Sequence, residues 1–218
     1  FGGTAGQIDF TNANSGDGII QQKVDAKDLV IQQYDGNEVI RFTDGQDVNI
    51  QHQKKLYLDG GGDSYLSHSA ADTVRHVVGG DILIQLTENG SEGNIVNFTT
   101  SAAGFTQHEP TYNASDTEVN FHTSGNKAFC TFGAGNITDL NLNFPAISGN
   151  FILLLKQDGT GSREVSNWKT FDQAGGNEST VVWAGGSAPT LTTTANKLDI
   201  LSFYWDNDNH KAYGVASL

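Results

Sequence analysis

The apolar residues of this 218-residue chain occur in short runs, and each run ends at a cluster of Gly, Asp, Asn or Ser. Phe151–Leu155, for example, is stopped by Gln157-Asp158-Gly159. Short apolar runs bounded by turn residues are typical of strands, whereas a helix needs a longer amphipathic stretch. With 26 Gly, 12 Phe, 6 Tyr and no Met, the composition also suits strands and tight turns. The pattern therefore predicts an all-β protein.

Residues 27–110 contain a loose repeat in which an Asp-Gly or Gly-Gly corner separates two short strands. Asp35-Gly36 between two alternating runs predicts a hairpin. The one segment with some helical character, Leu66–Val78, ends in β-branched residues and Gly79-Gly80, so we expect strand–turn–strand there.

Units this short cannot bury a core and must stack on neighbouring units or on other chains. We therefore expect a trimeric β-prism-like repeat stalk over about Lys27–Leu86, and the alternative is a single-chain β-solenoid. An N-terminal arm is expected at residues 1–26, and the stalk with a transition region at residues 27–110.

From residue 111 the strands become longer, and residues 111–218 are expected to form an antiparallel, jelly-roll-like β-sandwich head. Thr138–Phe144 alternates strictly, with Leu and Phe on one face and Asp and Asn on the other, as in a half-buried antiparallel strand. Leu198–Trp205 is apolar on both faces, which predicts a strand covered on both sides.

The charge and the cysteine content exclude several classes of protein. A formal net charge of −13 argues against nucleic acid as a partner, because phosphate binding needs clustered Lys and Arg. The single cysteine, Cys130, excludes an intrachain disulfide and lies among phenylalanines as a small buried side chain would. No apolar run approaches the length that spans a membrane, so no membrane insertion is expected.

No motif in the chain indicates catalysis or a cofactor. The histidines form no H-x-H or H-x-x-x-H pair, and no G-x-S-x-G occurs, so we expect neither a metal site nor an enzyme. A symmetric trimer could still bring copies of His68 or His76 to its axis. The abundant carboxylates keep a polysaccharide depolymerase open as an alternative function, although no Asp or Glu pair stands out.

The candidate ligand-binding residues lie in the C-terminal part of the chain. Tryptophan faces stack on sugar rings, and polar turns at one end of a sandwich are a usual place for recognition. Core packing is the favoured interpretation of each tryptophan, and of the three we expect Trp205 to be the one that is partly exposed, beside an oxygen-rich turn that resembles an incomplete calcium loop. The candidates are Trp205, Asp206, Asn207, Asp208, Asn209, His210, Trp168 and Trp183.

Three C-terminal segments resemble the C-terminal β-domain of bacteriophage tail-fibre and related virion proteins, especially marine ones. These segments are KQDGTGSR (156–163), WAGGSAPTLTTTANKLDILSFYWD (183–206) and KAYGVAS (211–217). The stretch KKLYLDGGGDSYLSHSAADTVRHVVGG (54–80) resembles the repeating β-module that precedes such domains in trimeric fibres. The resemblance covers roughly half of the chain and consists of strand and turn residues rather than catalytic signatures.

The resemblance implies a homotrimeric virion fibre or spike that extends from the particle and attaches to a host-surface glycan or protein. Its expected location is the virion, outside the cell, where other virion proteins are its neighbours. One alternative is a structural head fibre or capsid decoration protein without receptor binding, and the other is the depolymerase.

Overall fold

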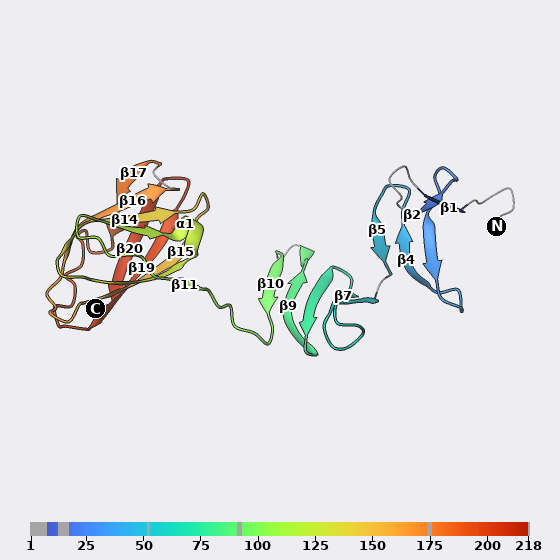
Figure 1. Ribbon diagram of the computed structural model, residues 1–218, viewed down its shortest axis with the longest axis horizontal. Coiled ribbons are helices and arrows are strands. Elements are labelled where there is room, and N and C mark those ends of the chain that lie inside the picture. Colours follow the sequence, from blue (N-terminus) through green and yellow to red (C-terminus); the bar gives the residue numbers. More distant parts are fainter. Residues whose placement is uncertain (1–7, 13–17, 52, 91–92, 174–175, 218) are drawn as a thin grey trace. The chain divides into compact units, whose positions relative to one another are not determined.

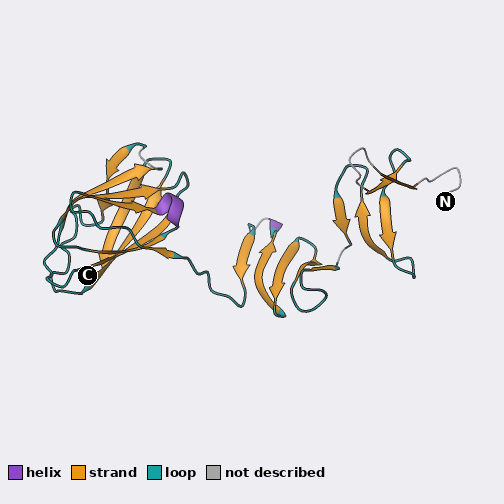
Figure 2. Cartoon of the chain, in the orientation of Figure 1, coloured by secondary structure: helices purple, strands orange, loops and turns teal. Residues whose placement is uncertain are grey.

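The computed structural model of the protein describes residues 8–12, 18–51, 53–90, 93–173 and 176–217, and its regular structure is almost entirely β-strand (Figures 1 and 2). The predicted all-β fold class is thus confirmed. The chain divides into two compact units, Phe1–Ala103 and Gly104–Leu218.

The N-terminal unit consists of antiparallel hairpins and meanders. One hairpin pairs β1 (Ile8–Asn12) with β2 (Gly18–Gln22). The next sheet joins β3 (Leu29–Gln32), β4 (Glu38–Phe42) and β5 (Val48–Ile50) in sequence order. The last sheet has the order β10-β9-β8-β7-β6, from β6 (Lys55–Tyr57), β7 (Tyr65–Ala70), β8 (Thr73–Val78), β9 (Asp81–Thr87) and β10 (Ile95–Phe98).

Local turn chemistry sets these hairpins. The predicted Asp35-Gly36 hairpin is confirmed, because β3 and β4 pair antiparallel across it. Gly36 has a φ of 79°, a left-handed value that favours glycine, and its N–H donates to Gln33 O at 3.0 Å. The strand–turn–strand prediction for Leu66–Val78 is confirmed by the antiparallel β7–β8 pair.

The N-terminal unit has almost no buried apolar side chain of its own. Among its described residues, only Thr73 and Val77 are buried. Large apolar side chains remain exposed on its strands and turns, among them Ile20, Ile31, Phe42, Val48, Ile50, Leu56, Leu58, Val74, Val78, Leu86, Ile95, Val96 and Phe98.

The C-terminal unit is a sandwich of two sheets over the described residues (Figure 1). The larger sheet has the order β11-β13-β15-β19-β20-β18, from Gln107–His108 (β11), Lys127–Thr131 (β13), Gly149–Lys156 (β15), Leu198–Asp206 (β19), Lys211–Ser217 (β20) and Val182–Trp183 (β18). The smaller sheet has the order β12-β14-β16-β17, from Asp116–Asn120 (β12), Ile137–Phe144 (β14), Val165–Asp172 (β16) and Glu178–Thr180 (β17). A single helical turn, α1 (Phe121–Ser124), links β12 to β13.

From β11 to β16 the chain passes alternately between the two sheets. Consecutive strands therefore lie in opposite layers, and each strand pairs with the next but one, in parallel. In the C-terminal unit the antiparallel pairs among the described strands are β15–β19, β19–β20 and β16–β17. The prediction of an antiparallel, jelly-roll-like sandwich is thus wrong for the strands from β11 to β16 that pair in parallel. The links after these strands, such as 132–136, cross between the layers instead of turning back as hairpins.

The hydrophobic core lies between these two sheets. All described members of the core cluster fall between Val119 and Ala212. The inward side chains of β14, Leu140, Leu142 and Phe144, are fully buried, as its alternation predicts. The expected half-buried antiparallel strand is wrong, because Asn141 and Asn143 on the other face are buried too and β14 pairs in parallel with β12 and β16. The core therefore holds the C-terminal unit as a folded body from which its loops project.

Candidate functional site

The predicted oxygen-rich run forms the turn between β19 and β20. The Asp206 carboxylate accepts the N–H groups of Asp208 at 3.1 Å and Asn209 at 3.2 Å, and the side-chain amide of Asn209 at 2.8 Å. These bonds, with the Asn209 amide the largest contributor, lower the pKa of Asp206. Asp206 is thus occupied in closing the turn, while Asp208 and Asn209 are exposed.

The same turn is tied to neighbouring segments. His210 Nδ1 lies 2.9 Å from Asp172 Oδ2 at the end of β16, an ion pair when the imidazole is protonated. The pKa of Asp172 is lowered, first by the hydrogen bond from the Asn177 side chain. Asn207 N–H donates to Ser148 Oγ at 2.9 Å. The turn therefore has a defined conformation and presents polar groups at one end of the sandwich.

The expectation that Trp205 is partly exposed is wrong. Its side chain is fully buried, because Trp205 shares the inward face of β19 with Leu201 and Phe203. The indole ring stacks on Phe144 with centroids 4.8 Å apart, and Nε1–H donates to Pro145 O at 3.0 Å. Trp205 therefore stabilises the core and presents no face to a ligand.

The other two candidate tryptophans form an edge-to-face pair with ring centroids 5.1 Å apart. Trp168 is buried, whereas Trp183 is half-buried at the edge of the larger sheet. The Trp183 ring lies close to Gly214, where an added Cβ would approach it to 2.7 Å. The structure thus places the eight candidate residues in two groups, the turn and the tryptophans, and leaves only Trp183 of the tryptophans accessible.

A groove of about 540 Å³ on the outside of the larger sheet brings the candidate Trp183 together with two tyrosines that were not among the eight candidate residues. Trp183, Tyr204 and Tyr213 line it, together with Asn150 from β15. Tyr204 and Tyr213 are direct neighbours in the β19–β20 register. The period-two pattern of β19 was the signal for this face, which we predicted to be covered within the sandwich. In the structure it is open.

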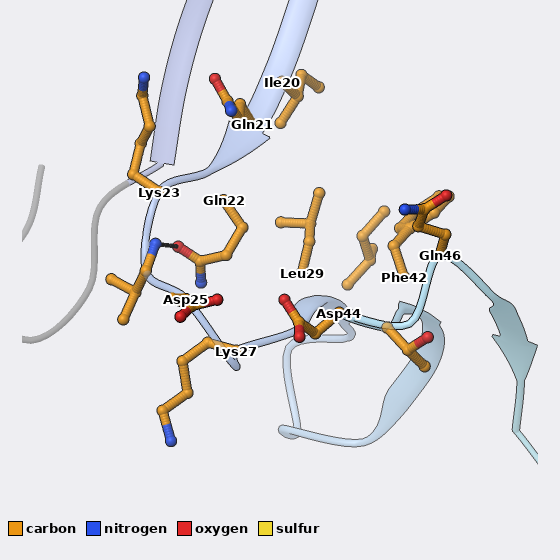
Figure 3. A pocket seen from close by; sticks show the side chains of 13 residues that line it. Ile20, Gln21, Gln22, Lys23, Asp25, Lys27, Leu29, Phe42, Asp44 and Gln46 are labelled. Carbon is orange, nitrogen blue, oxygen red and sulfur yellow. Dashed lines mark hydrogen bonds between the residues drawn. The ribbon is translucent and has the colours of Figure 1, made fainter.

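A second cavity, of about 840 Å³, lies in the N-terminal unit. Ile20 of β2, Leu29 of β3 and Phe42 of β4 lie around it, with Asp25 and Asp44 nearby (Figure 3). Its walls are mixed, with five apolar lining residues and eight polar or charged ones. Ile20, Ile31 and Phe42 are exposed there, so the cavity includes uncovered apolar strand surface.

No group of three or more His, Cys, Asp or Glu side chains among the described residues is arranged to hold a metal ion. The part of the chain that the structure describes also contains no helix long and apolar enough to cross a membrane. No protein-family model, curated protein or solved structure matches this chain.

Proposed function

We propose that this chain is a bacteriophage virion fibre or spike protein, a homotrimer that extends from the particle and attaches to a host-surface glycan. The N-terminal unit is the stalk and the C-terminal unit is the head. The observation that carries the proposal is the lack of cover over the apolar side chains of the N-terminal unit.

The apolar side chains of the N-terminal unit have exposed fractions too large for sheets that are stable in isolation. Ile20 is 58% exposed, Leu58 67% and Val96 62%. Covering each such side chain contributes about 1.5–3 kcal/mol, so burial against other copies stabilises the stalk substantially. A short β unit that cannot build its own core gains one by association with identical chains. The proposed number of three subunits follows from the resemblance of residues 54–80 to the modules of trimeric fibres.

Attachment is assigned to the turn Asp206–His210 at one end of the head. Asp208 and Asn209 are exposed there on a backbone held by hydrogen bonds, so their polar groups are pre-organised for a hydroxyl-rich ligand. Three copies of a weak site gain roughly a hundred- to ten-thousand-fold in overall affinity when they engage one surface. Other virion proteins are the remaining partners of the proposed fibre.

The stalk assembly is tested by native mass measurement. We expect a species three times the 23.3 kDa chain mass. Ile31→Lys, on an exposed apolar position that lines the cavity, weakens the assembly, because it places a charge in the covered surface. The matched control is Gln32→Lys, the next residue along β3, which is polar and exposed and does not line the cavity. A wild-type chain that stays at 23.3 kDa at all concentrations contradicts the proposal.

Attachment is tested on an array of immobilised bacterial capsular and lipopolysaccharide glycans. We expect retention that falls with Asp208→Ala and is unchanged by Thr131→Ala, a surface change elsewhere on the head. Shortening of the array glycans would instead favour a depolymerase. Localisation on the capsid, with no glycan retained, would favour the decoration protein.

A further inference from the structure

Two faces of the C-terminal sandwich differ sharply in chemistry. Side chains alternate along β15, β19 and β20, so one set packs into the core and the other projects from the outside of the larger sheet. The projecting set remains largely apolar: Ile200 is 42% exposed, Tyr204 49% and Val215 53%. We define the outer apolar face as Phe129, Ile152, Leu154, Val182, Leu198, Ile200, Tyr204, Tyr213 and Val215.

The strand register makes this face continuous. Phe129 of β13 lies beside Leu154 of β15, which lies beside Ile200 of β19. Ile152, Ser202 and Val215 form the next row, and in the row beyond it Tyr204 pairs with Tyr213, which pairs with Val182 of β18. Direct cross-strand neighbours are within contact distance of one another, so the face is one apolar surface rather than scattered residues.

On the strands that build this surface, the charged side chains lie around it, except Asp199 of β19, which is buried on the core side. Lys127 begins β13, Lys156 ends β15, and Asp206 and Lys211 flank the β19–β20 turn. An apolar centre with tyrosines and a charged rim is the usual anatomy of a protein–protein interface.

The outside of the smaller sheet has the opposite character. The Asn141 amide donates to Glu118 at 2.7 Å, and the Asn143 amide donates to Asn120 at 2.9 Å. Lys169 Nζ lies 3.1 Å from Asp139 and 3.3 Å from Glu178. Asn141 and Asn143 are themselves buried beneath these partners, and exposed carboxylates such as Asp116 and Glu118 form the surface above them. The outside of the smaller sheet is therefore polar where that of the larger sheet is apolar.

We propose that the outer apolar face is a subunit interface, covered in the assembled protein by a second copy of this chain. This inference rests on the proposed homo-oligomer and assigns it a specific surface in the head. The N-terminal unit of the same chain also leaves its apolar side chains exposed, so copies that associate there raise the local concentration of the C-terminal units. The face crosses β13, β15, β19, β20 and β18, which is broader than one small ligand needs.

The polar groups on the face are too few for a sugar to be its occupant. Asn150, Ser202, Ser217 and the two tyrosine hydroxyls are spread over several strands. A glycan needs several convergent hydrogen-bonding groups to replace its water, whereas an apolar partner surface does not. A second copy also leaves the Asp206–His210 turn, at the rim, available for attachment.

Thiol labelling of the full chain measures whether the face is covered. Val215→Cys places a thiol on the face, and Thr180→Cys places one on the exposed outside of β17 as the matched control. The native Cys130 adds little background, because its thiol is buried and burial raises its pKa to about 11. Each maleimide reaction rate is divided by the rate of the same variant in denaturant.

In the assembled protein we expect Val215→Cys to react at least about tenfold more slowly than Thr180→Cys, and both to react alike after dilution to monomer. As a second measure, Ile200→Lys raises the concentration needed for assembly at least about tenfold, whereas Thr180→Lys leaves it unchanged.

The outcomes separate this inference from the proposed stalk. An assembled chain in which Val215→Cys and Thr180→Cys react equally fast overturns the interface and leaves the stalk assembly standing. A monomeric native mass overturns the assembly itself. Protection of Val215→Cys that appears only when capsular polysaccharide is added assigns the face to a glycan and overturns the second copy as its occupant.

Discussion

The Trp205 ring lies parallel to the Phe144 ring, with an interplanar angle of 8° and centroids 4.8 Å apart. This pair joins the two sheets of the C-terminal unit, since Phe144 ends β14 of the smaller sheet and Trp205 belongs to β19 of the larger one. The indole also donates to Pro145 O at 3.0 Å, so one side chain supplies both packing and a hydrogen bond at the junction.

Removing this side chain should destabilise the C-terminal unit strongly. We expect Trp205→Ala to lower its free energy of unfolding by about 3–5 kcal/mol, because a large cavity opens between the sheets. Trp205→Phe keeps a stacked ring, loses the hydrogen bond and costs less, about 1–2 kcal/mol. All three tryptophans lie in this unit, so tryptophan fluorescence in a guanidinium titration reports its unfolding. An unchanged midpoint for Trp205→Ala would remove Trp205 from the core.

Gly161 should tolerate no side chain. It has a φ of 80°, and an added Cβ would lie 2.7 Å from Ala195 N and clash with Thr193 O. Gly161→Ala combines left-handed strain with a backbone clash, and we expect a loss of about 2 kcal/mol or more. The matched control is Gly159→Ala, two residues earlier, where the space around the Cβ is open and the change stays within about 0.5 kcal/mol. Equal unfolding midpoints for the two variants would contradict this geometry.

The C-terminal unit should lose stability in acid. The Arg163 guanidinium, which donates to Asp158 at 2.7 and 2.9 Å, is the main cause that holds the pKa of Asp158 below its ordinary value of 3.8. The pKa of Asp139 is lowered too, chiefly by Asn167. Because the folded-state pKa values are depressed, the stabilisation is complete above about pH 5 and is lost as the pH falls through those values.

Melting temperatures followed by tryptophan fluorescence from neutral pH to about pH 3 measure this effect. Asp158→Asn should melt lower at neutral pH and show a smaller further drop in acid, because its ion pair with Arg163 is already lost. Asp208→Asn, a change of an exposed carboxylate in the β19–β20 turn, should follow the wild-type profile. A full wild-type acid response in Asp158→Asn would show that this pair contributes no pH dependence.

The sequence predicted the elements whose causes are local. Asp35-Gly36 specifies its hairpin through turn chemistry, and the strict alternation before Pro145 specifies β14 and its buried face. The polar run Asp206–Asn209 likewise predicted a turn. The partners of that turn, Asp172 and Ser148, lie far away in sequence and only the folded sandwich brings them to it.

Strand pairing and the orientation of β19 depended on information that no local pattern contains. The β13–β15 pair is parallel because the intervening strand belongs to the opposite sheet, which the short links do not reveal. In β19 both faces are apolar, so alternation alone did not distinguish Trp205, which is buried, from Tyr204, which is open. The choice follows from which residues of the opposite sheet, such as Phe144, complete the core.

The alternation of the chain between the two sheets bears on how quickly this unit reaches its native state. Paired residues in the parallel strands from β11 to β16 lie 20 to 28 positions apart in sequence, as Lys127 and Ile152 do. None of these pairs can therefore form through a short hairpin turn. Each contact requires a long loop to close before any favourable energy is gained, and chains with such connectivity fold slowly. Moreover, Phe151 of β15 pairs with Phe203 of β19, which is synthesised much later. During synthesis the two sheets of this unit can therefore pack together only after β19 and β20 have left the ribosome.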